Sequence, residues 1–176
     1  MTDNSHNSAN QPVEFLVKYI DLIPTGRALD VAMGRGRNAI YLAKMGFEVE
    51  GIDNSPETVE EALANARAEG VTIWTKVEDL EKIPSVTGES YDLVICFNYL
   101  QRSLIPHMKN WIKPGGMLMY ETFIVEQARF GKPNNPDFLL KHNELLDMFR
   151  EFRVLRYREG IIDNRKAIAS ILAQKV

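Results

Sequence analysis

Residues 28–44 read ALDVAMGRGRNAIYLAK, and this stretch decides the fold. Residues 28–32 are short and apolar, which is typical of a buried strand. The glycine-rich turn 34–36 follows, and residues 38–44 have the spacing of an amphipathic helix. The stretch therefore predicts a strand, a tight turn and a helix in immediate succession.

The same order of elements is repeated along the chain. Strands that are apolar almost throughout indicate a parallel sheet covered by helices on both faces, and alternating strands and helices indicate the α/β class. The strand-like runs are 28–32, 47–52, 71–75, 91–97 and 117–121, and the helical patterns are 13–23, 38–44, 56–69 and 103–112.

The C-terminal third departs from this pattern. Residues 123–143 hold a glycine, two prolines and a pair of asparagines, and they are too long for an ordinary connection, so we expect a lid or substrate loop. A short helix is expected at 144–149. The runs 152–158 and 167–173 have no helix-length connection between them, which predicts an antiparallel hairpin.

Composition narrows the class of protein. The 176 residues carry 21 basic and 24 acidic side chains, a formal net charge of −3, which argues against nucleic acid as the main partner. Cys96 is the only cysteine, so we expect no disulfide within the chain, no metal–cysteine site and a reducing, cytoplasmic setting. No apolar run approaches the roughly 20 residues of a membrane span. Residues 1–11 are predicted to form a polar tail, and 12–176 a single domain.

The glycine-rich turn is also a candidate ligand site. Gly34, Gly36 and Ala39 fit the pattern G-x-G-x-x-G/A, in which the backbone and a helix N-terminus approach a nucleotide-like ligand. Alone, the pattern is equally well explained by packing. Asp53 strengthens the case, because it ends the second strand 17 residues after Gly36, near the spacing at which a carboxylate binds ribose hydroxyls. A turn residue or helix cap is its alternative role.

Two observations disfavour a nicotinamide cofactor. None of the six tyrosines is followed four positions later by a lysine, the spacing that short-chain dehydrogenases use. Asp30 lies two residues before Ala32 in the first strand, where a pyrophosphate needs no carboxylate but an amino-acid ammonium group does. A hydrogen-bonding group at the end of a strand is the alternative role of Asp30.

Taken together, these motifs resemble the class I S-adenosylmethionine-dependent methyltransferases. Residues 29–38 look like the first motif of that family, and with 39–43 and 51–53 they are similar to the tellurite-resistance (TehB-like) branch. Residues 78–80 resemble the adenine-binding motif, 91–94 the fourth-strand motif, and 114–116 the loop before the fifth strand.

The resemblance implies a doubly wound, Rossmann-like α/β fold with a seven-stranded mixed sheet, strand order 3-2-1-4-5-7-6 and strand 7 antiparallel. It also implies S-adenosylmethionine as cofactor and S-adenosylhomocysteine as product. The implied cofactor residues are Asp30, Ala32, Gly34, Gly36, Arg37 and Asn38 around the methionine part, Asp53 and Asn54 at the ribose, Asp79 and Leu80 at the adenine, and Phe97 and Asn98 near the amino group and the methyl.

The sequence departs from the family at several positions. Met33 stands where many relatives have a smaller residue, Arg35 is bulky, and the chain from Phe123 onward does not match the tellurite-resistance branch closely. The resemblance itself implies a small-molecule acceptor, tellurite-like or another small nucleophile. We expect the protein to be a monomer or homodimer with no metal site and no membrane partner.

Methyl transfer from a sulfonium needs no protein nucleophile, so few catalytic side chains are required where the acceptor binds. Tyr99 and Glu121, near the ends of the fourth and fifth strands, are the candidate catalytic residues, each as a wall or hydrogen-bonding group more than as a base. Arg158 belongs to an alternating arginine series that is typical of a solvated face, with contact to an anionic substrate as the alternative.

Three other functions stay open at this point. An NAD(P)-linked oxidoreductase shares the glycine-rich turn and the ribose acid, and a non-catalytic nucleoside-binding domain shares the fold. A nucleic-acid methyltransferase fits less well, because the net charge is acidic and Asn98-Tyr99 is not followed by the prolines of the adenine-methylating motif.

Overall fold

The computed structural model describes residues 10–82, 84–86 and 88–176, which form a seven-stranded sheet with the order β3-β2-β1-β4-β5-β7-β6. Strand β7 is antiparallel to β5 and β6, and the other neighbours are parallel. The order and direction expected from the sequence are confirmed. The strands are β1 (Arg27–Val31), β2 (Glu48–Asp53), β3 (Trp74–Val77), β4 (Tyr91–Phe97), β5 (Ile112–Phe123), β6 (Arg153–Ile162) and β7 (Lys166–Gln174).

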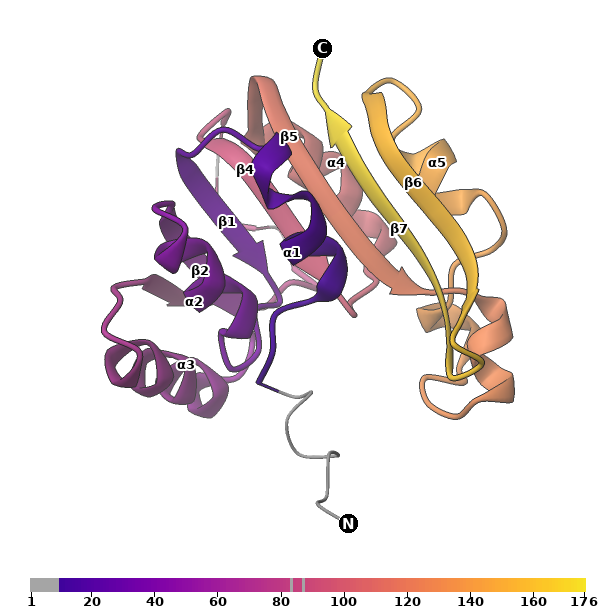
Figure 1. Cartoon of the computed structure of the whole chain (residues 1–176), viewed down its shortest axis with the longest axis horizontal. Helices are drawn as coiled ribbons and strands as arrows, with labels where there is room; N and C mark the ends of the chain where they lie inside the picture. The colour runs from indigo at the N-terminus through magenta and orange to yellow at the C-terminus, as the bar shows by residue number, and fades with distance from the viewer. Residues whose placement is uncertain (1–9, 83, 87) are drawn as a thin grey trace.

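Helices cover both faces of the sheet (Figure 1). One buried cluster joins the sheet to α1, α2 and α3, and the other joins it to α4 and α5. The α-helices are α1 (Glu14–Tyr19), α2 (Arg37–Lys44), α3 (Pro56–Ala68), α4 (Ile105–Trp111) and α5 (Glu144–Met148); the 3₁₀ helices are η1 (Ile20–Leu22), η2 (Arg102–Leu104), η3 (Val125–Arg129) and η4 (Pro136–Phe138).

The central strand β4 shows why the apolar runs are unbroken. Leu93, Ile95 and Phe97 pack into the cluster beneath α1 to α3. Val94 and Cys96 pack into the cluster beneath α4 and α5. Successive side chains of a strand point to opposite faces, so a strand that is covered on both sides needs an apolar residue at every position.

Several boundaries differ from those expected; strand β6, for example, continues to Ile162, beyond the expected end at 158. Strand β5 begins at Ile112, not at 117, because Ile112 already pairs with Tyr91, and residues 114–116 lie within the strand beside a register shift. Strand β3 begins at Trp74, since the backbone N–H of Val71 still donates to the carbonyl of Ala66 at the end of α3. Helix α1 ends at Tyr19, and the last turn of the expected helix is the 3₁₀ helix η1.

The irregular segment 123–143 is closed at its base. The backbone N–H of Val125 donates to the carbonyl of Leu140 over 3.0 Å, and that of Leu140 donates to the carbonyl of Phe123 over 2.9 Å. Between these points the chain holds η3 and η4 and forms a lobe beside the C-terminal hairpin (Figure 1). The lid function expected of this segment stays a prediction.

The N-terminal end of the chain is described only from Asn10. The tail expected over residues 1–11 therefore lies outside the described residues, apart from 10 and 11. Within the part of the chain that is described, no helix has both the length and the apolar character that crossing a bilayer would require.

Candidate functional site

The candidate site lies at the carboxyl edge of the sheet, where β1, β2 and β4 end. In the register, Val31 of β1 pairs with Ile52 of β2 and with Cys96 of β4, so the residues that follow these strands meet at one edge. Strands β1 and β4 are neighbours, and from them the strand order continues in opposite directions across the sheet. Such a topological switch point is the usual place for a ligand in a doubly wound sheet. Asp30, Asp53 and Asn98 all come from these strand ends.

The turn from β1 to α2 is tight and left-handed at several positions. Ala32, Gly34 and Gly36 have φ of +54°, +56° and +83°. Alanine in this region costs on the order of 1–2 kcal/mol, whereas glycine adopts it freely. A Cβ on Gly36 would lie 3.1 Å from the Cβ of Ala62, so α3 approaches the start of α2 closely at this point.

Asp53 joins the end of β2 to the glycine turn. Its Oδ2 accepts the backbone N–H of Gly34 over 2.9 Å, and its Oδ1 accepts that of Ser55 over 3.1 Å. Each carboxylate oxygen has a second lone pair, so the group can still accept hydrogen bonds from two neighbouring hydroxyls. The turn and the carboxylate that the sequence predicts to act together are therefore in direct contact.

Asp30 is the most perturbed acid of the site. Its residue is 1% exposed, and its Oδ2 has no hydrogen-bond partner among the described residues. Burial raises the pKa of Asp30 to about 8; Asp53 adds to this, whereas the backbone N–H of Ala39 and the charge of Arg37 oppose it. Because buried polar atoms are nearly always paired, an unpaired carboxyl oxygen at this edge fits an ammonium group supplied by a ligand.

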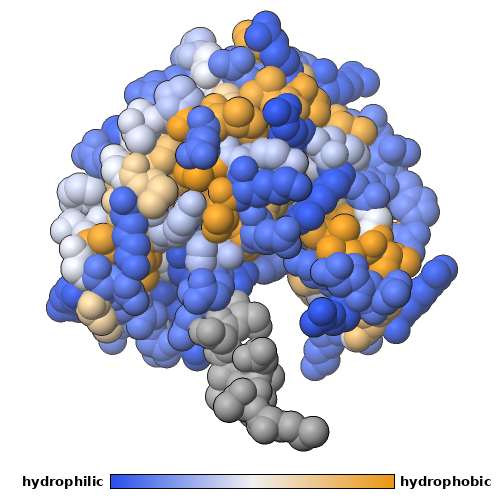
Figure 2. Space-filling view, viewed as in Figure 1, coloured by the Kyte–Doolittle hydropathy of each residue, from blue (hydrophilic) through white to orange (hydrophobic). Residues whose placement is uncertain are grey.

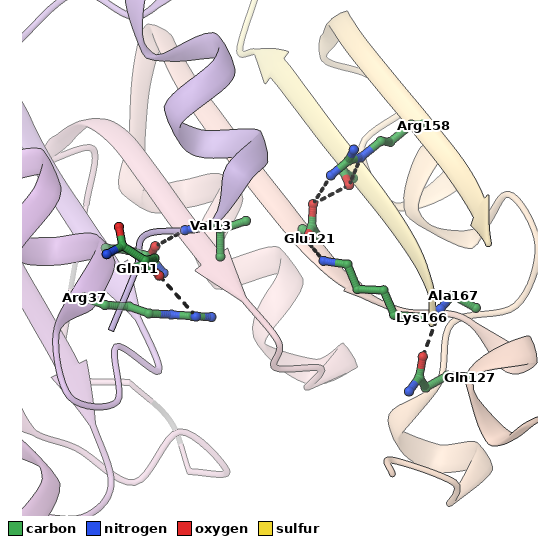
Figure 3. Close-up of polar contacts among 10 residues, drawn as sticks. Gln11, Val13, Arg37, Glu121, Gln127, Arg158, Lys166 and Ala167 are labelled. Atoms are coloured by element: carbon green, nitrogen blue, oxygen red, sulfur yellow. Dashed lines mark hydrogen bonds and ion pairs between the residues drawn. The ribbon is translucent and has the colours of Figure 1, made fainter. Parts of the chain in front are cut away.

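Arg37 and Asn38, expected at the methionine part of the cofactor, contact the N-terminal segment (Figure 3). The Oδ1 of Asn38, which is buried, accepts the backbone N–H of Val13 over 2.9 Å. Arg37 Nη1 donates to the carbonyl of Gln11 over 3.3 Å. Both residues thus hold the segment before α1 against the glycine turn, a role for which the sequence contains no local signal.

The adenine-side residues follow β3. Asp79 is bound by the backbone N–H of Glu81 over 3.1 Å and by Lys82 over 2.9 Å. The hydrogen bond from Lys82 is the main cause of the lowered pKa of Asp79, which keeps it an acceptor at neutral pH. Leu80 is buried at 4% exposure, and Asn54, after β2, is exposed.

At the end of β4, Phe97 is buried and Asn98 turns outward. Asn98 has φ of +57°, and its backbone N–H donates to the carbonyl of Glu121 over 2.8 Å. The chain therefore bends away from the sheet directly after Phe97. The exposed side chain of Asn98 lies at the same edge as Asp30 and Asp53.

Glu121 is held in a row of polar side chains across three strands (Figure 3). Its Oε2 accepts the hydroxyl of Ser170 on β7 over 2.6 Å and Nη2 of Arg158 on β6 over 3.2 Å. Lys166 Nζ lies 3.8 Å from Oε1. With 1% exposure, Glu121 is a buried, paired carboxylate, and the alternating arginine series contributes Arg158 to that pair.

Tyr99 follows Asn98 and is half-buried. Burial is the main cause that raises the pKa of Tyr99 to about 12, so the phenol is neutral at physiological pH. Its carbonyl accepts the hydroxyl of Tyr120 over 2.6 Å, which fixes the loop after β4. A cavity of about 300 Å³ opens beside it, lined by Glu81, Asn98, Tyr99, Leu100, Gln101, Thr122, Phe123, Pro133 and Phe138.

Sequence reasoning missed the aromatic part of this cavity. Phe123, Pro133 and Phe138 lie in the irregular segment, where no periodic pattern indicates which side chains face the sheet edge. Across the described residues, no three His, Cys, Asp or Glu side chains are grouped so that they could hold a metal ion.

Comparison with known proteins finds several methyltransferases, and also a protein named Hemagglutinin 1 of Eikenella corrodens that is 25% identical over 77% of this chain and 46% of its own length. A family described as "Methyltransferase domain" matches residues 28–116. A ubiquinone biosynthesis O-methyltransferase of Xanthomonas axonopodis pv. citri is 30% identical over 69% of this chain and 54% of its own length. A probable S-adenosyl-L-methionine-dependent methyltransferase, TehB of Haemophilus influenzae, is 25% identical over 83% of this chain and 52% of its own length.

The solved structure of the Haemophilus influenzae TehB has the same fold. It aligns with a TM-score of 0.78 at 22% identity, over 93% of this chain and 62% of that one. The chain spans about half the length of the curated relatives that it matches.

Proposed function

This chain belongs to the class I S-adenosylmethionine-dependent methyltransferase family, and from that premise we propose that it transfers the methyl group of S-adenosylmethionine to a small-molecule acceptor. The observation that carries the proposal is the buried Asp30 carboxyl with an unpaired oxygen, at the edge where Asp53 meets the glycine turn. The ammonium group and the ribose of one such ligand match these two acids.

The residues present fit the cofactor at each of its parts. We assign Asp30 to the ammonium group, Asp53 and Asn54 to the ribose hydroxyls, and Asp79 and Leu80 to the adenine. The backbone of Ala32, Gly34 and Gly36 bounds the methionine end, Phe97 and Asn98 border the methyl, and Arg37 and Asn38 act there through the N-terminal segment that they hold.

The bound cofactor would supply an activated methyl group on a sulfonium, which carries its own leaving group. The protein then contributes mainly alignment, which can lower a barrier by roughly 7–11 kcal/mol. The carboxylates Asp53, Asp79 and Glu81 lie around Tyr99 and further raise its pKa, and the same negative field favours a cationic ligand.

Neither candidate catalytic residue is placed as a strong base. Tyr99 is neutral at pH 7, and Glu121 is committed to Ser170 and Arg158. We propose Tyr99 as a wall and hydrogen-bond donor of the acceptor site and Glu121 as a group that fixes the strand ends. The acceptor must then bring a nucleophile that reacts without a strong protein base.

The relatives support a small-molecule acceptor of several kinds. They include O-methyltransferases of ubiquinone biosynthesis, a glycine/sarcosine N-methyltransferase and TehB. A tellurite-like acceptor, a cytoplasmic location, a monomer or homodimer and the absence of nucleic-acid partners belong to this proposal. The family match favours methyl transfer over the NAD(P)-linked oxidoreductase and the non-catalytic domain.

Titration calorimetry with S-adenosylhomocysteine tests the proposal. We expect the wild type to bind and Asp53→Ala to bind at least about tenfold more weakly, because hydrogen bonds to a charged group contribute about 1.5–3 kcal/mol each. Asp21→Ala, an exposed acid of η1 outside the site, is the matched control and should bind as the wild type does. Equal affinity in Asp53→Ala and wild type would remove Asp53 from the site, and no binding to the wild type would refute the function.

A further inference from the structure

Phe138 is a large aromatic residue that is both exposed and firmly held. It ends η4 and is 54% exposed. Apolar side chains of the segment gather on the lobe at the lower right of the molecule (Figure 2). The exposed large ones on this segment are Val125, Phe130 and Phe138.

The backbone on both sides of Phe138 is fixed by one arginine. Arg102 Nη1 donates to the carbonyl of Asp137 over 2.8 Å, and Nη2 donates to the carbonyl of Leu139 over 2.9 Å. The same guanidinium forms a bidentate pair with Glu144, with distances of 2.6 and 3.0 Å. Such fork-shaped contacts are geometrically specific, so Arg102 fixes the backbone from which the ring of Phe138 projects.

The turn before Phe138 is closed in the same way. Asn135 Oδ1 accepts the backbone N–H of Asp137 over 3.0 Å, and the backbone N–H of Phe138 donates to the carbonyl of Asn135 over 3.0 Å. Leu139, the next residue, is buried. The exposed ring therefore projects from a fixed backbone, and a ligand that covered its apolar face would remove that surface from water.

The held ring borders the cavity at the end of β4. Phe138, Phe123 and Pro133 line the cavity of about 300 Å³ together with Asn98 and Tyr99, and the same three line an adjoining hollow of about 390 Å³. A closed apolar cavity of about 150 Å³ accepts benzene, so there is room for one or two rings. The apolar residues Leu100, Phe123, Pro133 and Phe138 share the lining with the polar residues Glu81, Asn98, Tyr99, Gln101 and Thr122, a mixture that suits an organic ligand with polar substituents.

We propose that this cavity takes a planar aromatic acceptor, whose ring stacks on Phe138 and whose polar substituents reach Asn98, Tyr99 and Thr122. The assignment rests on the proposed function, because the methyl group bordered by Asn98 makes the occupant an acceptor. In the transfer, a heteroatom on the ring forms a bond to the methyl carbon while the carbon–sulfur bond breaks. The electron pair of that bond stays on sulfur, and the proton of the heteroatom goes to water.

A ligand-observed NMR titration tests this inference by measuring how tightly catechol binds to the protein saturated with S-adenosylhomocysteine. We expect catechol to bind at least tenfold more tightly than trans-cyclohexane-1,2-diol, which has the same hydroxyl pair without a π-face. Phe138→Ala should weaken catechol binding about tenfold, the upper range of a stacking contact. Phe138→Tyr, which keeps the ring, should retain it.

Phe130→Ala is the matched control, because Phe130 is an exposed aromatic residue of the same segment that does not line the cavity. It should bind catechol as the wild type does. No catechol binding to the wild type, equal binding of the two diols, or equal loss in Phe130→Ala and Phe138→Ala would overturn the proposal.

The catechol experiment can fail independently of the experiment that tests the proposed function. Binding of S-adenosylhomocysteine is measured first, without catechol, and its absence counts against the function alone. The catechol titration of the protein without S-adenosylhomocysteine then still decides whether the cavity selects an aromatic ring. Binding of S-adenosylhomocysteine without binding of catechol leaves the function standing and refutes the aromatic acceptor site.

Discussion

Replacing Asp30 with asparagine tests the role of the buried carboxyl group, whose burial disfavours its charged form. The pKa of Asp30 rises on folding from an ordinary 3.8 to about 8. Between these values the folded protein keeps a proton that the unfolded chain has released, so stability falls as pH rises through this window. Within this window the free energy of unfolding falls by about 1.4 kcal/mol for each pH unit. Between pH 5 and pH 7 the Asp30 carboxyl therefore lowers it by about 3 kcal/mol. Asp30→Asn should escape that loss and be the more stable protein at pH 7.

The same substitution should weaken cofactor binding. An ammonium group bound at Asp30 favours the carboxylate form, so binding must expel the proton that the empty site holds. With a pKa of about 8, roughly nine tenths of the protein carries that proton at pH 7. The wild type should therefore release most of one proton when it binds S-adenosylhomocysteine, and Asp30→Asn should release none.

Calorimetry in two buffers of different ionisation enthalpy, phosphate and Tris, measures this proton directly. The difference between the two binding enthalpies gives the number of protons released. Urea unfolding at pH 5 and pH 7 measures the stability difference between the proteins. A wild type that releases no proton, or an Asp30→Asn variant that binds with unchanged affinity, would show that Asp30 does not meet the ammonium group.

The remaining predictions concern packing and the polar row. Gly36→Ala should lower the unfolding free energy more than Gly115→Ala, by on the order of 1 kcal/mol or more in chemical denaturation, because both have positive φ but only Gly36 is close to Ala62. Similar losses in the two variants would mean that the close approach of α3 adds nothing. Arg158→Met should cost about 2–4 kcal/mol, because it leaves the buried Glu121 carboxylate with only a distant lysine and a hydroxyl. A loss below about 1 kcal/mol in thermal unfolding would show that Glu121 does not depend on this pair.

The strands and helices could be predicted because they depend on patterns that repeat along the chain, namely apolar runs and glycine and proline turns. The order of the seven strands was implied by the family resemblance, and the structure has that order. Boundaries were less accurate where a hydrogen bond between neighbouring elements decides them. The pairing of Ile112 with Tyr91 extends β5 backward through two glycines, and no propensity indicates it.

In the candidate site, too, the motif residues could be predicted from the sequence, whereas the long-range contacts could not. Asp53 and Gly34 belong to motifs with fixed spacing, which predicts that both act on one ligand, whereas the hydrogen bond between them is a finding of the structure. The contact between Val13 and Asn38 joins residues 25 positions apart, and that between Arg158 and Glu121 spans 37 positions. Such contacts depend on side-chain directions in the packed fold, which local sequence does not specify.

Three locally unfavourable features occur around one edge of the sheet. Ala32 adopts a left-handed backbone, Asp30 buries an unpaired carboxyl oxygen, and Phe138 keeps a fixed ring in water. Features of these kinds also occur elsewhere, for instance the buried Oε2 of Glu126, which has no partner among the described residues, and the half-exposed Trp74, whereas many other elements follow ordinary rules, such as the Ser55 cap at the start of α3. Conflicts between local preference and fold persist where function selects for them. If these three served packing, relieving them would change stability alone. For Asp30→Asn we expect both stability and binding to change: the protein should be more stable and should bind its cofactor less well. The buried oxygen that opposes folding is the one that pairs with the ammonium group of the ligand.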